Sequence, residues 1–125
     1  MSVLIENALL LPCTPEMPVI DGGWVLVEGE HVAATGAGAP PEGVAEGVAE
    51  RLDAGGDLVM PGFVNPHAHL PMTLFRGLGE DVDDRLFRYV LPLERRFVSP
   101  RMVRTGTELA ALELVAGGVT TVADM

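Results

Sequence analysis

Lysine is absent from this sequence, and basic residues of any kind are scarce. The 125 residues contain 8 arginines against 18 aspartates and glutamates, which gives a formal net charge of -10 at pH 7. Proteins that bind nucleic acid or an anionic membrane through charge present a basic face, so this balance argues against both partners. The acidic excess is concentrated in residues 1–66, which carry ten acidic residues against Arg51 alone, whereas residues 67–125 carry eight against seven arginines.

Cysteine and long apolar stretches are equally scarce. Cys13 is the single cysteine and cannot form a disulfide within the chain. No apolar run approaches the ~20 residues that a membrane-spanning helix needs. The first residues, MSVLIENALLLP, lack the basic start and the small-residue cleavage site of a secretory signal peptide. We therefore expect a cytoplasmic protein with no membrane partner.

The chain is nevertheless apolar enough to fold, because hydrophobic residues make up 48% of it and charged residues 21%. Its first half is predicted to form short strands. Residues 24–35 indicate a hairpin that turns at Glu28-Gly29-Glu30, and the segments 51–54 and 57–60 are further strands. Residues 36–50, a Gly/Pro/Ala/Glu stretch with an EGVA-EGVA echo, are predicted to be a solvated surface loop.

The second half of the chain changes to a helical pattern between two apolar strands. Asp83 or Asp84 is predicted to start a helix that Pro92 cuts. Ser99-Pro100 is typical of a helix start, and Gly117-Gly118 of its end. The β-branched residues 119–123 then predict a strand, which together with the apolar residues 58–64 makes a parallel βαβ unit. A parallel strand needs a sheet covered on both faces, so we expect the front part of a longer protein.

The chemistry of the sequence lies in PGFVNPHAHL, residues 61–70. His67 and His69 are two positions apart, a spacing that places both side chains on one face only in an extended strand. Two imidazoles side by side at the end of a strand can hold Zn²⁺ or another borderline transition metal. The competing interpretation is a pair of ordinary polar loop histidines, because short motifs often match by chance.

The residues around this pair resemble the signature of the amidohydrolase superfamily. The segments MPGFVNPHAH, LPMTLFRG, PLERRFVSP and GGVTTVADM are similar to its deaminase and chlorohydrolase branch, which includes methylthioadenosine/S-adenosylhomocysteine deaminases and s-triazine hydrolases. The resemblance is specific from residue 58 onward and compatible before it. Asn65 supports this branch, because dihydroorotase- and hydantoinase-like members typically carry Asp at that place.

The resemblance implies an α/β fold, the start of a TIM-like (β/α)8 metal-dependent hydrolase barrel preceded by part of a small β-sandwich, in an incomplete chain. Residues 1–59 would be the N-terminal strands of the composite β-sandwich, and residues 60–125 the first βα units of the barrel. His67 and His69 would be two ligands of one divalent metal, Zn²⁺ or, as the alternative, Fe²⁺. The remaining ligands and all acid–base residues would lie beyond Met125, so no catalytic residue is assigned within this chain.

The expected reaction is attack of metal-bound hydroxide on an electron-poor C–N or C–Cl carbon of a small heteroaromatic substrate. Glu94 falls where nucleoside deaminases of the branch place a substrate-binding glutamate, although it could equally be a helix-surface residue paired with Arg95 or Arg96. Arg85-Leu86 and Leu91-Pro92 stand where the branch usually has Trp-Leu and Trp-Pro, which weakens the case for a nucleoside.

Other functions stay open from the sequence alone. One is a cyclic amide hydrolase of the dihydroorotase or hydantoinase kind. Another is a truncated, non-catalytic remnant, and a third is a small β-rich binding module with an incidental His-Xaa-His. A homo-oligomer of the full-length protein is also left open.

Overall fold

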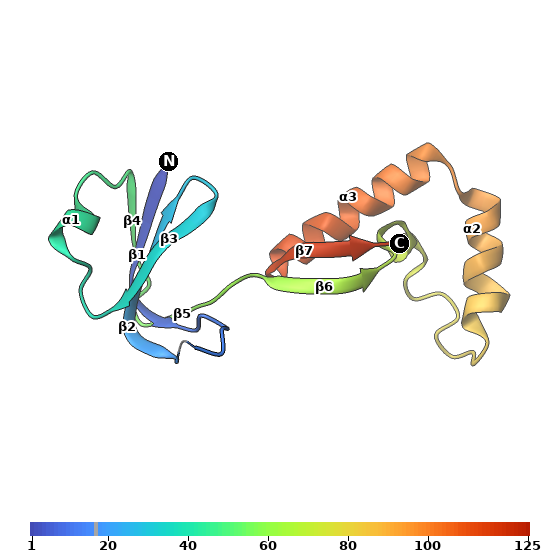
Figure 1. Ribbon diagram of the computed structural model, residues 1–125. Coiled ribbons are helices and arrows are strands. Elements are labelled where there is room, and N and C mark those ends of the chain that lie inside the picture. Colours follow the sequence, from blue (N-terminus) through green and yellow to red (C-terminus); the bar gives the residue numbers. More distant parts are fainter. Residues whose placement is uncertain (17) are drawn as a thin grey trace. The chain divides into compact units, whose positions relative to one another are not determined.

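A computed structural model describes residues 1–16 and 18–125 of the chain (Figure 1). The chain divides into two compact units, the N-terminal unit Met1–Pro61 and the C-terminal unit Gly62–Met125. The N-terminal unit contains β1 (Ser2–Leu10), β2 (Ile20–Glu28), β3 (His31–Ala37), α1 (Glu42–Ala45), β4 (Glu50–Asp53) and β5 (Leu58–Val59). The C-terminal unit contains β6 (Phe63–Ala68), the 3₁₀ helix η1 (Leu70–Phe75), the π-helical turn η2 (Leu86–Val90), α2 (Leu91–Phe97), α3 (Pro100–Ala116) and β7 (Val119–Asp124).

The sheet of the N-terminal unit has the strand order β3-β2-β1-β4, with β5 also paired to β1. The β2–β3 hairpin is antiparallel and pairs Glu28 with His31, which confirms the predicted hairpin. Gly29 has a φ of +62°, a conformation that costs glycine little and explains why this residue stands in the turn. Both β4 and β5 run parallel to β1, so the strands predicted at 51–54 and 57–60 are present but pair with β1 and not with each other.

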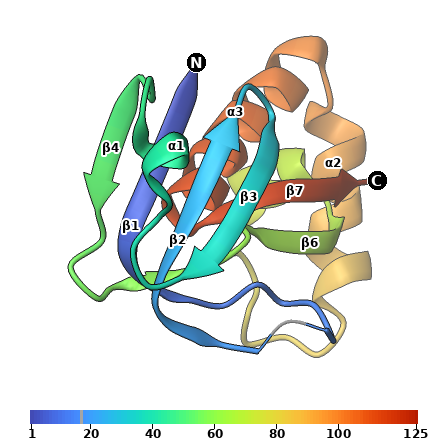
Figure 2. The same ribbon diagram turned by 60° about the vertical axis from the view of Figure 1, so that its left-hand side comes forward.

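One face of this sheet forms a closed core around Leu4, Trp24 and Leu26. Val44, Ala45 and Val48 pack against these side chains, and Figure 2 shows α1 lying across β1 and β2. The prediction of a solvated loop over 36–50 was therefore wrong for α1 and Val48, although most residues of the segment are exposed. The EGVA echo supplies both covering valines: Val44 lies in α1, and Val48 follows the turn at Gly47, whose φ is +77°.

The opposite face of the same sheet is an open apolar groove with a volume of about 420 Å³. Its lining comes from β1, β2, β3 and the segment that follows β5: Ile5, Leu10, Leu11, Pro12, Thr14, Val25, Val27, Val32, Thr35, Val59, Met60 and Pro61. Strand alternation explains the two faces, because Leu4 and Leu26 point to the core while their neighbours Ile5 and Val25 point to the groove.

The C-terminal unit is built on β6 and β7, which pair in parallel (Figure 1). The long crossover between them contains α3, whose start is fixed by Ser99: its hydroxyl accepts a hydrogen bond from Met102 N–H at 3.2 Å. The parallel β-helix-β arrangement and the helix over 100–116 are thus as predicted from the sequence, and the mixed α/β class is confirmed. Among the described residues, the structure contains no helix long and apolar enough to cross a membrane.

Pro92 does not end a helix, contrary to the prediction. The helical segment begins at Leu86 with the π turn η2 and passes through Pro92 into α2, which ends at Phe97. Leu91 N–H bonds to the Leu86 carbonyl in this wider turn, and proline falls in the first turn of α2, where a missing N–H is tolerated.

Gly106 brings η1 against α3. A Cβ atom at this position would lie 2.5 Å from the Pro71 main-chain oxygen, closer than Cβ atoms approach other heavy atoms in proteins. The glycine in the middle of a helix costs roughly 0.5–1 kcal/mol relative to alanine. This close approach buries Leu70 and Phe75 of η1 together with Ala110 of α3, and it sets where η1 leaves the strand.

Candidate metal centre

The histidine pair lies at the end of β6. His67 is on the strand, Ala68 is its last residue, and His69 is the residue from which η1 starts. Because alternate residues share a face of a strand, both rings emerge on the same side. Their Nε2 atoms lie 3.2 Å apart, and the rings meet edge to face at 78° with their centroids 5.1 Å apart.

This separation fits two ligands of one metal ion. Nitrogen ligands that lie ~2.0–2.1 Å from a tetrahedral Zn²⁺ are about 3.3 Å apart. Within residues 1–16 and 18–125, no third histidine, cysteine or carboxylate joins the pair to form a complete cluster. The donor set therefore suits part of a metal site, and a complete one needs further ligands.

Asn65 fixes the strand just before the first histidine. Its side-chain oxygen accepts a hydrogen bond from His67 N–H at 3.2 Å, a local turn that asparagine forms readily. Sequence reasoning used Asn65 only as a marker of a family branch. The structure adds that this side chain shapes the backbone on which His67 stands.

His69 is held by the end of β7. Its Nδ1 atom lies 3.1 Å from the Met125 main-chain oxygen, and the next residue, Leu70, donates its N–H to a carboxylate oxygen of Asp124 at 2.8 Å. Sequence reasoning did not single out Asp124 or Met125. The only available signal was that Asp124 follows directly on the strand at 119–123, where polar residues at strand ends gather in α/β folds.

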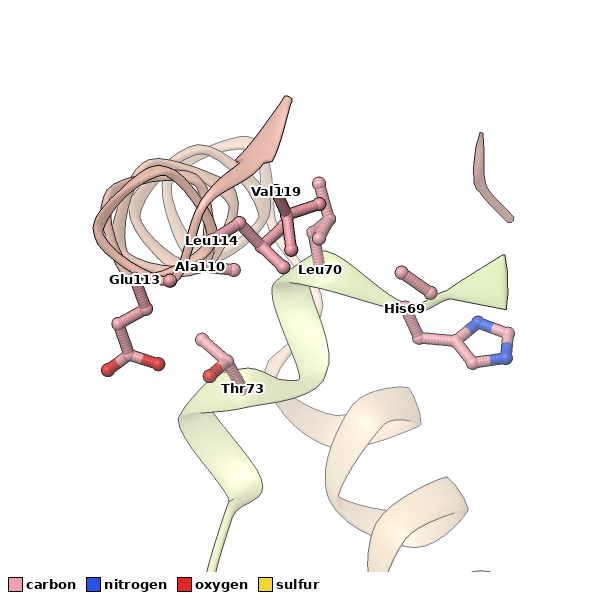
Figure 3. Close-up of a pocket in the computed structure, with 9 residues that line it drawn as sticks. His69, Leu70, Thr73, Ala110, Glu113, Leu114 and Val119 are labelled. Atoms are coloured by element: carbon pink, nitrogen blue, oxygen red, sulfur yellow. The ribbon is translucent and has the colours of Figure 1, made fainter. Parts of the chain in front are cut away.

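In the part of the chain that the structure describes, His69 lines a larger and a smaller cavity. The larger, about 580 Å³, lies between η1, η2 and the loop that joins them. Apart from His69 it is lined by apolar and charged side chains and one threonine: Met72, Thr73, Phe75, Arg76, Glu80, Asp83, Arg85, Leu86 and Val90. Its volume lies within the range of small-molecule sites, roughly 300–1,000 Å³. The smaller, about 450 Å³, lies between η1, α3 and the strands, and Figure 3 shows the His69 ring pointing away from Ala110 and Leu114.

Arginines brace the wall of the larger cavity. Arg76 donates from both terminal nitrogens to the carboxylate of Glu113 on α3, at 2.6 and 2.9 Å. This hydrogen bonding raises the pKa of Arg76 and lowers the pKa of Glu113. Arg85 donates to the carbonyls of Leu78 and Phe75 and so ties the loop to η1. Both arginines thus bond to other groups of the protein. The contacts of Arg76 indicate a structural role, in which it holds the end of η1 against α3.

Glu94 lies in the first turn of α2 and is partly buried. Its carboxylate makes no ion pair with Arg95, Arg96 or any other arginine in the part of the chain that the structure describes. It lines neither of the cavities that adjoin His69. The helix-surface pairing that competed with a substrate role is thus not made.

Comparison with known proteins extends these observations. The chain is 39% identical to a 5-methylthioadenosine/S-adenosylhomocysteine deaminase of Symbiobacterium thermophilum, over 98% of this chain and 28% of that protein. A solved adenosine deaminase of Xanthomonas campestris with bound zinc matches with a TM-score of 0.84 and 31% identity, covering 98% of this chain and 28% of that one. An atrazine chlorohydrolase of Arthrobacter aurescens, also complexed with zinc, shares the fold with a TM-score of 0.75 and 22% identity over 98% and 28% of the two chains.

The sequence profile of the amidohydrolase family matches residues 58–125, which include β6, β7 and the histidine pair. The chain spans about 28% of the length of the deaminases that it resembles. The profile covers more than half of the chain, and the fold of a solved zinc-containing relative agrees with it. The chain belongs to the amidohydrolase family.

Proposed function

We propose that the full-length protein is a metal-dependent hydrolase that removes an exocyclic amino or halide group from a heteroaromatic ring. The observation that carries this proposal is the pair of Nε2 atoms 3.2 Å apart at the end of a parallel strand. Zinc in two structural relatives and the deaminase names of the sequence relatives support it. One divalent ion, Zn²⁺ or alternatively Fe²⁺, would be held by His67 and His69 together with further ligands.

The proposal includes the wider architecture. Residues 1–59 would supply strands to a composite β-sandwich, and residues 60–125 would begin a (β/α)8 barrel. The parallel pairing of β6 and β7 supports a barrel start, because all eight strands of such a barrel are parallel. Active sites in these barrels are built at the carboxyl ends of the strands. His67 and His69 stand at the carboxyl end of β6, at such a position.

A bound divalent metal would supply the chemistry by lowering the pKa of its water so that hydroxide forms near neutrality. The residues of this chain contribute in other ways. His67 and His69 present two imidazole nitrogen donors on one face, and the Asn65 side chain holds the backbone of His67. The larger cavity beside His69 offers Met72, Phe75 and Leu86 as apolar surface for a flat ring.

An electron-poor ring carbon is the preferred target. Ring nitrogens next to a C–NH₂ or C–Cl bond withdraw electrons, and this makes the carbon open to attack by hydroxide. A purine such as an adenosine derivative meets this requirement, as do aminopyrimidines and triazines. The deaminase relatives favour an aminated purine ring over a cyclic amide.

The deciding experiment replaces each histidine with alanine in the full-length protein. His67→Ala and His69→Ala should each lower bound metal and remove most turnover, because three remaining ligands hold the ion less tightly. His31→Ala is the matched control, since it removes an exposed histidine of the N-terminal unit. Full metal content and near-normal turnover in the double variant would contradict the proposal.

The substrate class is tested by ammonia and chloride release from aminopurines, adenosine derivatives, aminopyrimidines and triazines, with dihydroorotate and hydantoin alongside. Turnover confined to the last two would instead identify a cyclic amide hydrolase. We further propose that Glu94 binds the sugar of a nucleoside substrate. Glu94→Ala should then lower kcat/KM for adenosine derivatives by about 10-fold or more through lost hydrogen bonds. Unchanged kcat/KM would leave it a surface residue.

A further inference from the structure

The end of β7 holds the segment around His69 from both sides. Asp124 pairs with Ala68 in the parallel register, and Met125 N–H donates to the Ala68 carbonyl at 3.0 Å. On the other side of the histidine, Leu70 N–H donates to the Asp124 carboxylate at 2.8 Å. Met125, which follows β7, thus bonds to the residue before His69, and Asp124, the last residue of β7, bonds to the residue after it.

The Asp124 contact replaces a cap that His69 itself does not provide. The first N–H groups of a helix have no partner within it, and the residue before the helix normally satisfies one of them with a side-chain oxygen. His69 occupies this position in η1 and makes no such bond. The Asp124 carboxylate takes the Leu70 N–H from the neighbouring strand, which leaves the imidazole of His69 free to bind elsewhere.

The Met125 contact determines which ring nitrogen of His69 is free. A main-chain oxygen can only accept a hydrogen bond, so the Nδ1 atom 3.1 Å away must carry the hydrogen. In a neutral imidazole the other nitrogen then has its lone pair exposed. That nitrogen is Nε2, the atom that faces His67 at 3.2 Å.

We propose that Asp124 is a positioning residue for the metal ligand His69: it caps η1 from β7 and, with the Met125 main-chain oxygen, fixes the place and tautomer of the imidazole. The inference deepens the proposed function and rests on it. It adds a residue that touches neither metal nor substrate and acts through His69. Partners of this kind typically change metal affinity by about 10–100-fold when they are removed.

The test compares Asp124→Ala with Asp124→Asn in the full-length protein. Asparagine keeps a side-chain oxygen that can accept the Leu70 N–H, whereas alanine keeps none. Zn²⁺ affinity, measured by competition with a chelator, should fall about 10–100-fold in Asp124→Ala and stay close to the parent value in Asp124→Asn. Asp81→Ala, which removes an exposed aspartate of the same unit, should leave affinity unchanged.

A second measurement covers the case in which Asp124→Ala does not fold. Nitrogen-15 NMR of the metal-free parent and of Asp124→Asn should show the hydrogen of His69 on Nδ1. A hydrogen on Nε2 overturns the positioning role and leaves the proposed function intact. The same conclusion follows if Asp124→Ala binds Zn²⁺ as tightly as the parent while His67→Ala loses the metal. Unchanged affinity in the histidine variants as well overturns both.

Discussion

The two units of the chain bury their apolar side chains in different ways. The N-terminal unit closes a core on one face of its sheet, with Leu4 fully buried beneath α1. The C-terminal unit buries residues between its helical segments, but the side chains of Phe63 and Val64 on β6 remain exposed. The unit that carries the candidate metal centre is thus the one with the less complete core.

This difference follows from strand number and pairing. A sheet can cover one face by itself when a connecting segment folds back over it, as the segment with α1 does. Within the described residues of the C-terminal unit, two parallel strands with one long helix leave a sheet face and both outer edges without partners. The difference shows that the histidine pair at the end of β6 can have a defined local geometry although one face of the sheet that carries it is exposed.

Self-association is the largest effect that we expect from this contrast. The 125-residue chain, expressed as it stands, should form oligomers through the C-terminal unit, because exposed apolar strands with free edges are templates for pairing. Val64 and Val32 offer a matched pair, since they are 65% and 64% exposed. Val64→Glu should reduce the oligomer measured by sedimentation velocity more than Val32→Glu does.

The result that would break the comparison is a monomeric chain with one cooperative unfolding transition. An equal response to the two glutamate substitutions would also contradict it, since association would then not depend on β6. In the full-length protein, where further strands are expected to pair with β6 and β7, the unsubstituted protein should not associate through these strands.

Core truncation gives the next largest effect. Leu4→Ala removes a side chain that is 0% exposed, whereas Leu112→Ala removes one that is 72% exposed. We expect Leu4→Ala to lower the free energy of unfolding by about 2–5 kcal/mol and Leu112→Ala to change it by less than about 0.5 kcal/mol. Urea denaturation of the 125-residue chain followed by Trp24 fluorescence measures the first. Far-UV circular dichroism, which also reports α3, measures the second. Equal losses would mean that Leu112 is covered in solution.

Local signals in the sequence predicted much of the fold. The hairpin around Gly29 and the helix that starts at Ser99 were predictable because turn and cap residues act on their immediate neighbours. The α1 cover and the passage of the helix through Pro92 were missed. Both depend on what surrounds the segment: the sheet beneath Val44, and the π turn before Pro92.

In the candidate site, too, local features were predictable from the sequence and contacts between distant residues were not. The spacing of His67 and His69 predicted that they share a face, because strand geometry alone decides this. The contacts of Asp124 and Met125 with the segment around His69 span 54 and 56 residues in the sequence, and no local pattern signals them. They arise from the register of β6 and β7, which is a property of the folded sheet.

The smallest effect concerns the ion pair between Arg76 and Glu113, which joins η1 to α3. Both side chains are largely exposed, so water and salt weaken the pair, and its contribution should be far smaller than that of Leu4. Hydrogen bonding from Arg76 lowers the pKa of Glu113 below its ordinary value of 4.5. A lowered pKa means that the stabilisation is present above that ordinary value and is lost as the pH falls through the folded-state pKa.

Glu113→Gln should therefore lower the thermal midpoint slightly at neutral pH and leave it unchanged at a pH below the folded-state pKa of Glu113, where the parent carboxylate is protonated too. High salt should shrink the difference at neutral pH. Glu108→Gln is the matched control, because Glu108 pairs with Arg104 within α3 and joins no second element. Differential scanning fluorimetry of the three proteins across pH measures the effect. A midpoint lowered equally at both pH values would show that Glu113 acts through packing, and that the junction of η1 with α3 depends on Gly106 and its apolar neighbours.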